Sequence, residues 1–204
     1  MRLGEVAKRF GVSKSAVQRA FRAWAFYYHG TVDAFRDPNG WIDVPQEFID
    51  WMENSHKQTI VGVAEELGVH PDTLFQKFKE WCELRGVSLK VFRRPVWIGR
   101  LAYRYVLPRD FIEWYRAKRS KREKALENFR RACEVIRRAR PGLGEKGVKK
   151  WVVKEYLWWC EITGRDPERV DGHMYNYTDE FVRWLEVRYL GGKVSGLREE
   201  AQGE

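Results

Sequence analysis

One pattern of residues occurs twice in this chain, and it constrains the fold more than any other feature. Segment 6–17 reads VAKRFGVSKSAV, and segment 63–74, at an offset of 57, reads VAEELGVHPDTL. The two segments keep Val, Ala, Gly and Val at matching positions, whereas most polar residues differ. This indicates a duplicated structural module, because both copies need the same core while their outward residues are free to diverge.

The similarity extends over a module of about sixty residues. At the offset of 57, the further matches are Val17 with Leu74, Phe21 with Phe78, and Trp24 with Trp81. At an offset of 63, VPQEFIDWM (44–52) matches LPRDFIEWY (107–115), so the second copy holds six extra residues between its matched blocks. We predict a first module over 1–58, a second over 59–122, and a helical C-terminal domain over 123–204.

Each copy has the pattern of two helices joined by a tight turn. Val6, Ala7 and Phe10 lie on one helical face, and Gly11 follows where a helix ends in a left-handed residue. Ser13 is a typical N-cap for the second helix.

A hairpin and a third helix are expected next. Asn39-Gly40 is a strong signal for a turn between two strands, and Pro45 then opens a helix. In the second copy the hairpin region 91–108 is longer, with apolar and polar residues alternating around Gly99.

This order of elements resembles the winged helix-turn-helix, in the variant of the MerR and excisionase-like families. The residues that carry the resemblance are Val6, Ala7, Phe10, Gly11, Val12 and Val17, and again Val63, Ala64, Leu67, Gly68, Val69 and Leu74. It covers about 120 residues at the level of the fold. Together with the repeat and the helical pattern of the last third, it predicts a mainly α protein with short β-hairpin wings, two duplicated modules and a C-terminal helical domain. It also implies binding of double-stranded DNA, with the second helix in the major groove and the hairpin against the backbone.

The charge of the chain points to the same class of partner. There are 38 Lys and Arg against 29 Asp and Glu, a net charge of +9. Segment 59–122 holds 14 basic and 7 acidic residues, whereas 1–58 and 123–204 are each close to neutral. Such a balance favours nucleic acid before membrane, since no amphipathic basic helix stands outside the globular pattern.

The outward positions of the modules supply the candidate DNA-contacting residues. Gln and Arg side chains read adenine and guanine, whereas Ser and Lys suit phosphate. In the first module the candidates are Ser13, Lys14, Ser15, Gln18, Arg19, Arg22 and Arg36. In the second they are His70, Thr73, Gln76, Lys77, Arg93, Arg94, Arg100 and Arg104. The last four lie in the longer hairpin and are the main candidates for electrostatic affinity.

Plainer interpretations stay open for these surfaces. A polar helix face is often only solvated, and Asp72 either complements its helix dipole or accepts a hydrogen bond from cytosine. The run RAKRSKREK (116–124) is expected to belong to a connecting helix, with or without phosphate contacts.

The last third of the chain is helical and rich in aromatic residues. Segment 159–164 resembles 81–86, and 179–188 resembles 109–118, but the Ala-to-Gly turn is missing. A decayed third copy and an unrelated helical domain are both open. Dense aromatics and near-neutral charge suit a homo-oligomer or a protein partner, and the tail 191–204 is expected to be flexible.

The sequence favours a binding protein over an enzyme. It has no nucleophile elbow, phosphate-cradling loop or metal-ligand spacing, and its three cysteines and four histidines are scattered. No apolar run is long enough for a bilayer, and the start lacks a secretory signal. We expect no catalytic residues, cofactor, metal or membrane partner, and a cytoplasmic, DNA-associated location.

Two functional hypotheses follow. The first is a sequence-specific double-stranded DNA-binding protein, a transcriptional regulator or a DNA-organising accessory factor, that reads a composite site with two unequal modules. The second is a DNA-holding component of a viral packaging, replication or recombination machine that oligomerises through 123–204. RNA fits less well, since groove-reading helices suit B-form DNA.

Overall fold

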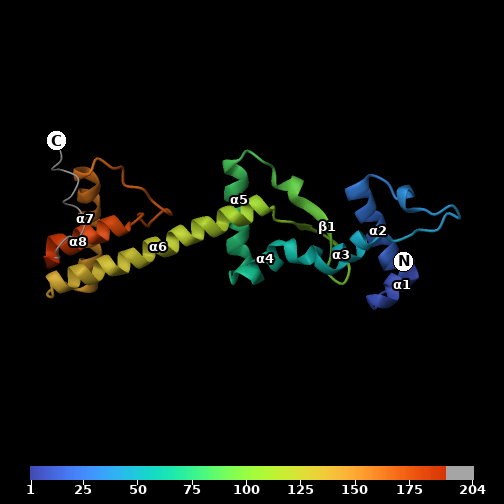
Figure 1. Ribbon diagram of the computed structural model, residues 1–204, viewed down its shortest axis with the longest axis horizontal. Coiled ribbons are helices and arrows are strands. Elements are labelled where there is room, and N and C mark those ends of the chain that lie inside the picture. The colour runs from blue at the N-terminus through green and yellow to red at the C-terminus, as the bar shows by residue number, and fades with distance from the viewer. Residues whose placement is uncertain (192–204) are drawn as a thin grey trace, which may run out of the picture. The chain divides into compact units, whose positions relative to one another are not determined.

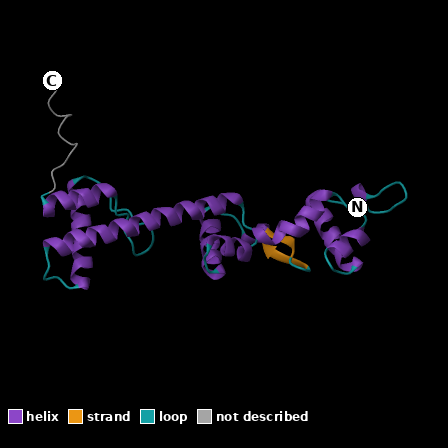
Figure 2. Ribbon diagram, turned by 60° about the horizontal axis from the view of Figure 1, so that its bottom comes forward, coloured by secondary structure: helices purple, strands orange, loops and turns teal. Residues whose placement is uncertain are grey.

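The chain folds mainly into α-helices, as its patterns predict. The computed structural model describes residues 1–191, which contain eight α-helices and one two-stranded antiparallel sheet (Figure 1, Figure 2). Residues 192–204, most of the tail expected to be flexible, lie outside the described residues. The chain divides into two compact units, Met1–Glu113 and Trp114–Glu204. Both segments that carry the sequence repeat therefore fall mainly in the first unit.

The first half of the first unit is built from three helices around an aromatic core. Its elements are α1 (Leu3–Arg9), α2 (Lys14–His29), the 3-10 turn η1 (Asp33–Phe35) and α3 (Gln46–Asn54). Gly11 has a φ of 64°, which favours glycine, and the Ser13 hydroxyl caps α2 by accepting the Ala16 N–H. The largest side chains of the core are Phe21, Trp24, Phe48, Ile49, Trp51 and Met52.

The hairpin expected around Asn39-Gly40 is a tight loop rather than a pair of strands. Gly40 has the left-handed φ of 78° that the turn requires, but a single bridge closes the loop 36–42 among the described residues. The carboxylate of Asp37 accepts the backbone N–H groups of Asn39 and Trp41, each at 2.9 Å. The side chain thus takes up donors that a strand ladder would otherwise use, and the ladder does not extend.

The second half of the unit has the same order of elements and a longer hairpin. Its elements are η2 (Ser55–Gln58), α4 (Ile60–Leu67), α5 (Pro71–Leu84), η3 (Leu89–Phe92), β1 (Arg93–Trp97), β2 (Leu101–Tyr105) and the start of α6 (Arg109–Ala139). The strands pair antiparallel around Gly99, which has a φ of 77°. The six extra residues of this copy therefore lengthen the hairpin.

The two halves form the same backbone hydrogen bonds at the offsets of the sequence repeat. The Val44 N–H donates to the Met1 carbonyl, and in the second half the Leu107 N–H donates to the Gln58 carbonyl. In the same way, the bond from Asp43 N–H to the Phe35 carbonyl is matched by the bond from Val106 N–H to the Phe92 carbonyl. In both matches the donors differ by 63 residues and the acceptors by 57. The likeness of the two segments therefore extends from their residues to their backbone contacts.

The β1–β2 hairpin packs against the first half of the unit. Trp97 is only 5% exposed and lies in the core formed by α1, α2 and α3. Its backbone N–H donates to the buried Ser55 hydroxyl at 2.8 Å. Because a strand from one half completes the core of the other, the two halves form one compact unit.

The described part of the second unit, residues 114–191, contains three helices. They are the C-terminal part of α6, α7 (Glu145–Ile162) and α8 (Asp179–Leu190). α6 is continuous through residues 122 and 123, so the boundary expected there falls inside a helix. The core of this unit consists of Ala132, Cys133, Val135, Ile136, Val148, Val152, Tyr156, Trp159, Cys160, Tyr177, Phe181, Val182 and Leu185.

The core of the second unit repeats the ring arrangement seen twice in the first. The T-shaped ring pairs are Phe21 with Phe48 at 5.1 Å, Phe78 with Phe111 at 5.0 Å, and Tyr156 with Phe181 at 5.2 Å. Trp24, Trp81 and Trp159 each follow three residues after the first ring of their pair and lie 5.5–5.8 Å from the second. The three sets thus share both spacing and geometry.

Candidate nucleic-acid interface

A groove in the first unit lies between α2 and the loop 36–42. It has a volume of about 390 Å³. Lys14 and Gln18 line it from α2, and Arg36 and Trp41 line it from the loop. The structure therefore brings together Lys14, Gln18 and Arg36, three of the residues predicted from sequence to contact DNA.

The exposed face of α2 carries positive charges that no carboxylate neutralises. Lys14, Arg19 and Arg22 are exposed and form no ion pair with any of residues 1–191. Cations of this kind are available to an anionic partner without first breaking an existing contact. Salt-dependent attraction to a phosphate backbone is the interaction that such a face supports best.

The two serines at the start of α2 form contacts of their own. The Ser13 hydroxyl accepts the Ala16 N–H at 3.2 Å and lies 3.0 Å from the Ser15 hydroxyl. Ser13 therefore caps the helix and fixes where its first turn begins. Ser13 also lies directly before Lys14, a residue that lines the groove.

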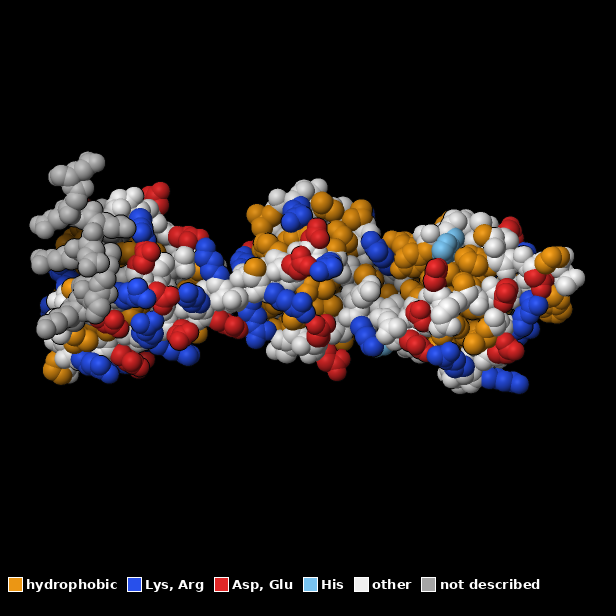
Figure 3. All heavy atoms as spheres, viewed as in Figure 1, with side chains coloured by type: hydrophobic (Ala, Val, Ile, Leu, Met, Phe, Trp, Pro, Cys, Tyr) orange, Lys and Arg blue, Asp and Glu red, His pale blue; other side chains and the backbone are white. Residues whose placement is uncertain are grey.

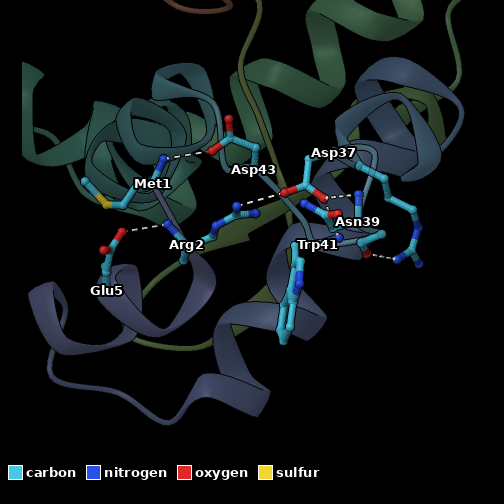
Figure 4. A network of polar contacts seen from close by, with 9 residues as sticks. Met1, Arg2, Glu5, Asp37, Asn39, Trp41 and Asp43 are labelled. Atoms are coloured by element: carbon cyan, nitrogen blue, oxygen red, sulfur yellow. Dashed lines mark hydrogen bonds and ion pairs between the residues drawn. The ribbon is translucent and has the colours of Figure 1, made fainter.

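A polar network braces the loop beside the groove (Figure 4). The Arg2 guanidinium donates to Asp37 at 2.8 Å, and this hydrogen bond is the main reason why the pKa of the Asp37 carboxyl lies below its ordinary value. The amino group of Met1 pairs with Asp43 at 3.0 Å. Arg36 donates to the Gly40 carbonyl at 2.8 Å. These contacts connect the start of the chain with the loop and hold one wall of the groove.

Two residues of this site were missed by the sequence analysis. Arg2 lines the groove and also pairs with Asp37. Trp41 is 62% exposed, and Figure 4 shows its ring projecting away from the Asp37 network. A tryptophan directly after an Asn-Gly turn was the available signal, because an apolar ring at the tip of a turn has little core to enter.

The corresponding helix of the second half, α5, offers less free charge than α2. His70 caps the helix, its Nδ1 accepting the Asp72 N–H at 3.3 Å. Lys77 pairs with Glu80 at 2.7 Å. Thr73 and Gln76 are exposed. The helix therefore presents polar side chains, but its predicted cation is already held by a carboxylate.

The four arginines of the β1–β2 hairpin do not share one environment. Arg93, Arg100 and Arg104 are exposed. Arg94 is half-buried, with its Cζ 5.8 Å from the centre of the Tyr27 ring and its Nε without an acceptor among the described residues. Alternating residues along the strand predicted that the hairpin has two faces. They did not predict that the first half of the unit covers one face, on which Arg94 is half-buried.

Charge on the molecular surface is mixed. On the face shown in Figure 3, Lys and Arg side chains are interspersed with Asp and Glu. Within residues 1–191, no cluster of three or more His, Cys, Asp or Glu is arranged to hold a metal ion. All three cysteines are buried, and burial raises the pKa of each thiol. The local groove, rather than a broad field or a reactive centre, is thus the candidate site.

Comparison with protein-family models, curated proteins and solved structures finds no match to this chain. Among the described helices, none combines the length and apolar character needed to cross a membrane. The geometry and charge of the candidate site are therefore the features that bear on function.

Proposed function

We propose that this chain is a sequence-specific double-stranded DNA-binding protein that reads DNA with the two halves of Met1–Glu113. The observation that carries the proposal is the groove between α2 and the loop 36–42, lined by Lys14, Gln18 and Arg36. A transcriptional regulator or a DNA-organising accessory factor is the role that fits such a reader.

The matched contacts of the two halves support their assignment as duplicated winged helix-turn-helix modules. In each half a short helix, a glycine turn and a longer helix are followed by a loop or hairpin and a closing helix. The backbone hydrogen bonds that join the segment before the closing helix to the residues preceding the first helix and to the 3-10 turn recur at the offsets of the repeat. In such modules the second helix enters the major groove.

The two modules have unequal tasks in this proposal. On α2, Gln18 and Arg19 suit contacts with base edges, and Lys14 suits contact with phosphate. α5 carries fewer unpaired cations than α2. The β1–β2 hairpin, by contrast, exposes Arg93, Arg100 and Arg104. The first module accordingly supplies most base readout, and the second adds polar contacts and electrostatic affinity.

A specificity measurement tests this division. We expect the double variant Gln18→Ala, Arg19→Ala to lower the ratio of affinities for a selected and a random duplex. Each lost base contact costs about 1–3 kcal/mol of discrimination, so the ratio should fall at least about 30-fold. The variant Lys14→Ala is the matched control, because loss of a phosphate contact weakens binding to both duplexes by the same factor.

The proposal is contradicted if no duplex can be selected from a random pool, or if the double variant leaves the ratio unchanged. The selection would use the full chain and competitive binding of labelled duplexes.

A further inference from the structure

A second groove, in the unit Trp114–Glu204, has no role in the function proposed above. Its volume is about 730 Å³. Lys149, Lys150 and Val153 line it from α7, and His173 and Met174 line it from the loop that precedes α8. Arg122 and Phe129 of α6 complete its wall.

This groove is the counterpart of the groove in the first unit. The buried residues of α7 recur at an offset of 135 from those of α2, and those of α8 recur at an offset of 133 from those of α3. At these offsets the lining residues correspond in pairs: Lys14 with Lys149, Gln18 with Val153, Gly40 with His173, and Trp41 with Met174.

The loop of the second unit supports the same correspondence. The Asp37 N–H bonds the Trp41 carbonyl, and at the offset of 133 the Val170 N–H bonds the Met174 carbonyl. The bridge that closes the loop 36–42 likewise recurs at 169–175. The geometry therefore favours a third copy of the module over an unrelated helical domain.

A row of unpaired lysines runs along α7 beside the groove. Lys146, Lys150 and Lys154 are four residues apart, so they lie on one side of the helix at steps of about 6 Å. All three are exposed, and none forms an ion pair with the described residues. Lys154 also lies over the Trp151 ring, with its Nζ 5.2 Å from the ring centre.

The other cations near this groove are neutralised within the unit. The pairs are Arg122 with Asp171 at 2.8 Å and Lys149 with Glu145 at 2.7 Å. The near-neutral charge of this part of the chain therefore conceals a local row of free positive charge. A regular line of cations beside a groove matches a regular line of phosphates better than the irregular charges of a protein surface.

The pair of residues that suits base edges in the first module is not kept in this copy. Val153 stands where the first module has Gln18, and Lys154, which belongs to the lysine row, stands where it has Arg19. Val forms no hydrogen bonds with a base edge, and Lys is a residue type that suits phosphate.

We infer that the second unit is a third module that clamps the phosphate backbone of duplex DNA without reading its sequence. This inference rests on the proposed function of the first unit and adds a site to it. The row Lys146, Lys150 and Lys154 contacts phosphates, and the groove receives the backbone of one strand.

The test compares the full chain with the triple variant Lys146→Ala, Lys150→Ala, Lys154→Ala. Alanine preserves helix propensity, so α7 should still form, and thermal unfolding by circular dichroism checks this. The matched control is Arg130→Ala, Arg138→Ala, Arg183→Ala, which removes three charges from exposed positions of the same unit outside the groove. Binding to a random and to a selected duplex is measured from about 50 to 200 mM salt.

Loss of three phosphate contacts should reduce the salt slope by about 2.7, so the affinity gap between wild type and variant changes about 40-fold over this range. Both duplexes should be affected equally, and the control should keep most of the wild-type slope. If the triple variant behaves like the control, the clamp is wrong while the proposed function of the first unit stands. If the triple variant loses self-association instead, the row is a protein interface and the clamp is also wrong. If wild type binds no duplex at all, the proposed function itself fails.

Discussion

At the scale of single residues, the loop beside the first groove depends on one carboxylate. Asp37 accepts hydrogen bonds from Arg2 and from the backbone N–H groups of Asn39 and Trp41. The sequence indicated the turn from Asn39-Gly40, but Arg2 and Asp37 are distant along the chain, and local spacing carries no information about their pairing. Trp41 differs, because its place directly after the Asn39-Gly40 turn was a local signal for an exposed ring.

The lowered pKa of Asp37 makes this loop sensitive to acid. Because the folded-state pKa lies below the unfolded value, the stabilisation is present above the ordinary pKa of about 4 and is lost as the pH falls below it. We expect the difference in Tm between wild type and Asp37→Asn to be largest near pH 6 and to shrink towards pH 3. Thermal unfolding at a series of pH values measures it.

The control for this prediction is Asp50→Asn, since Asp50 lies on the exposed side of α3 and forms no ion pair with the described residues. Its difference from wild type should vary much less with pH. A difference for Asp37→Asn that grows as the pH falls would contradict the account.

At the scale of elements, the sequence predicted the helices and their order better than their packing. Matched apolar positions and turn residues indicate α1, α2, α4 and α5, because helical spacing and caps are local properties. The burial of Trp97 against the first half was not predictable in this way, since alternation along a strand does not say what covers either face. The third copy that we infer in the second unit stayed open at the level of the sequence, because its turn lacks the Ala-to-Gly pattern.

Two helical glycines give a matched test of packing between elements. A Cβ at Gly62 in α4 would lie 2.5 Å from the His56 carbonyl oxygen, a backbone atom that cannot swing aside. At Gly4 in α1 a Cβ would meet nothing within 4 Å. We expect Gly62→Ala to destabilise the protein by about 1–3 kcal/mol, and Gly4→Ala to stabilise it by about 0.5–1 kcal/mol.

Chemical denaturation of both variants measures these changes. Equal effects of the two substitutions would show that α4 does not pack against η2 as closely as described. The comparison is informative because both variants gain the same methyl group and the same helix propensity.

At the scale of the whole molecule, the distribution of charge bears on the proposed binding of DNA. The net charge of +9 indicated an anionic partner, but its distribution along the sequence placed the surplus in 59–122. In the structure, unpaired cations also line grooves outside that segment, with Lys14 on α2 and Lys150 on α7, while Arg104 of the β1–β2 hairpin lines a groove within it. The net charge of a segment counts every charged residue equally. Ion pairs within the fold neutralise many of these residues, which are then less available to a partner.

The most direct test of α2 as the DNA-binding face is the salt dependence of binding between the full chain and duplex DNA. It is measured for wild type and for the variant Lys14→Ala, Arg19→Ala, Arg22→Ala. A second variant, Arg9→Ala, Arg85→Ala, Arg109→Ala, removes three cations of the same unit that already form ion pairs with Glu53, Asp110 and Glu113. We predict a steep linear fall of log K with log salt for wild type, and a near wild-type slope for the second variant. The slope of the α2 variant should be smaller by about 1.8, because Lys14 and Arg22 contact phosphates whereas Arg19 contacts a base edge. No binding at about 50 mM salt, or equal slopes for the two variants, would contradict the assignment of α2 as the DNA-binding face.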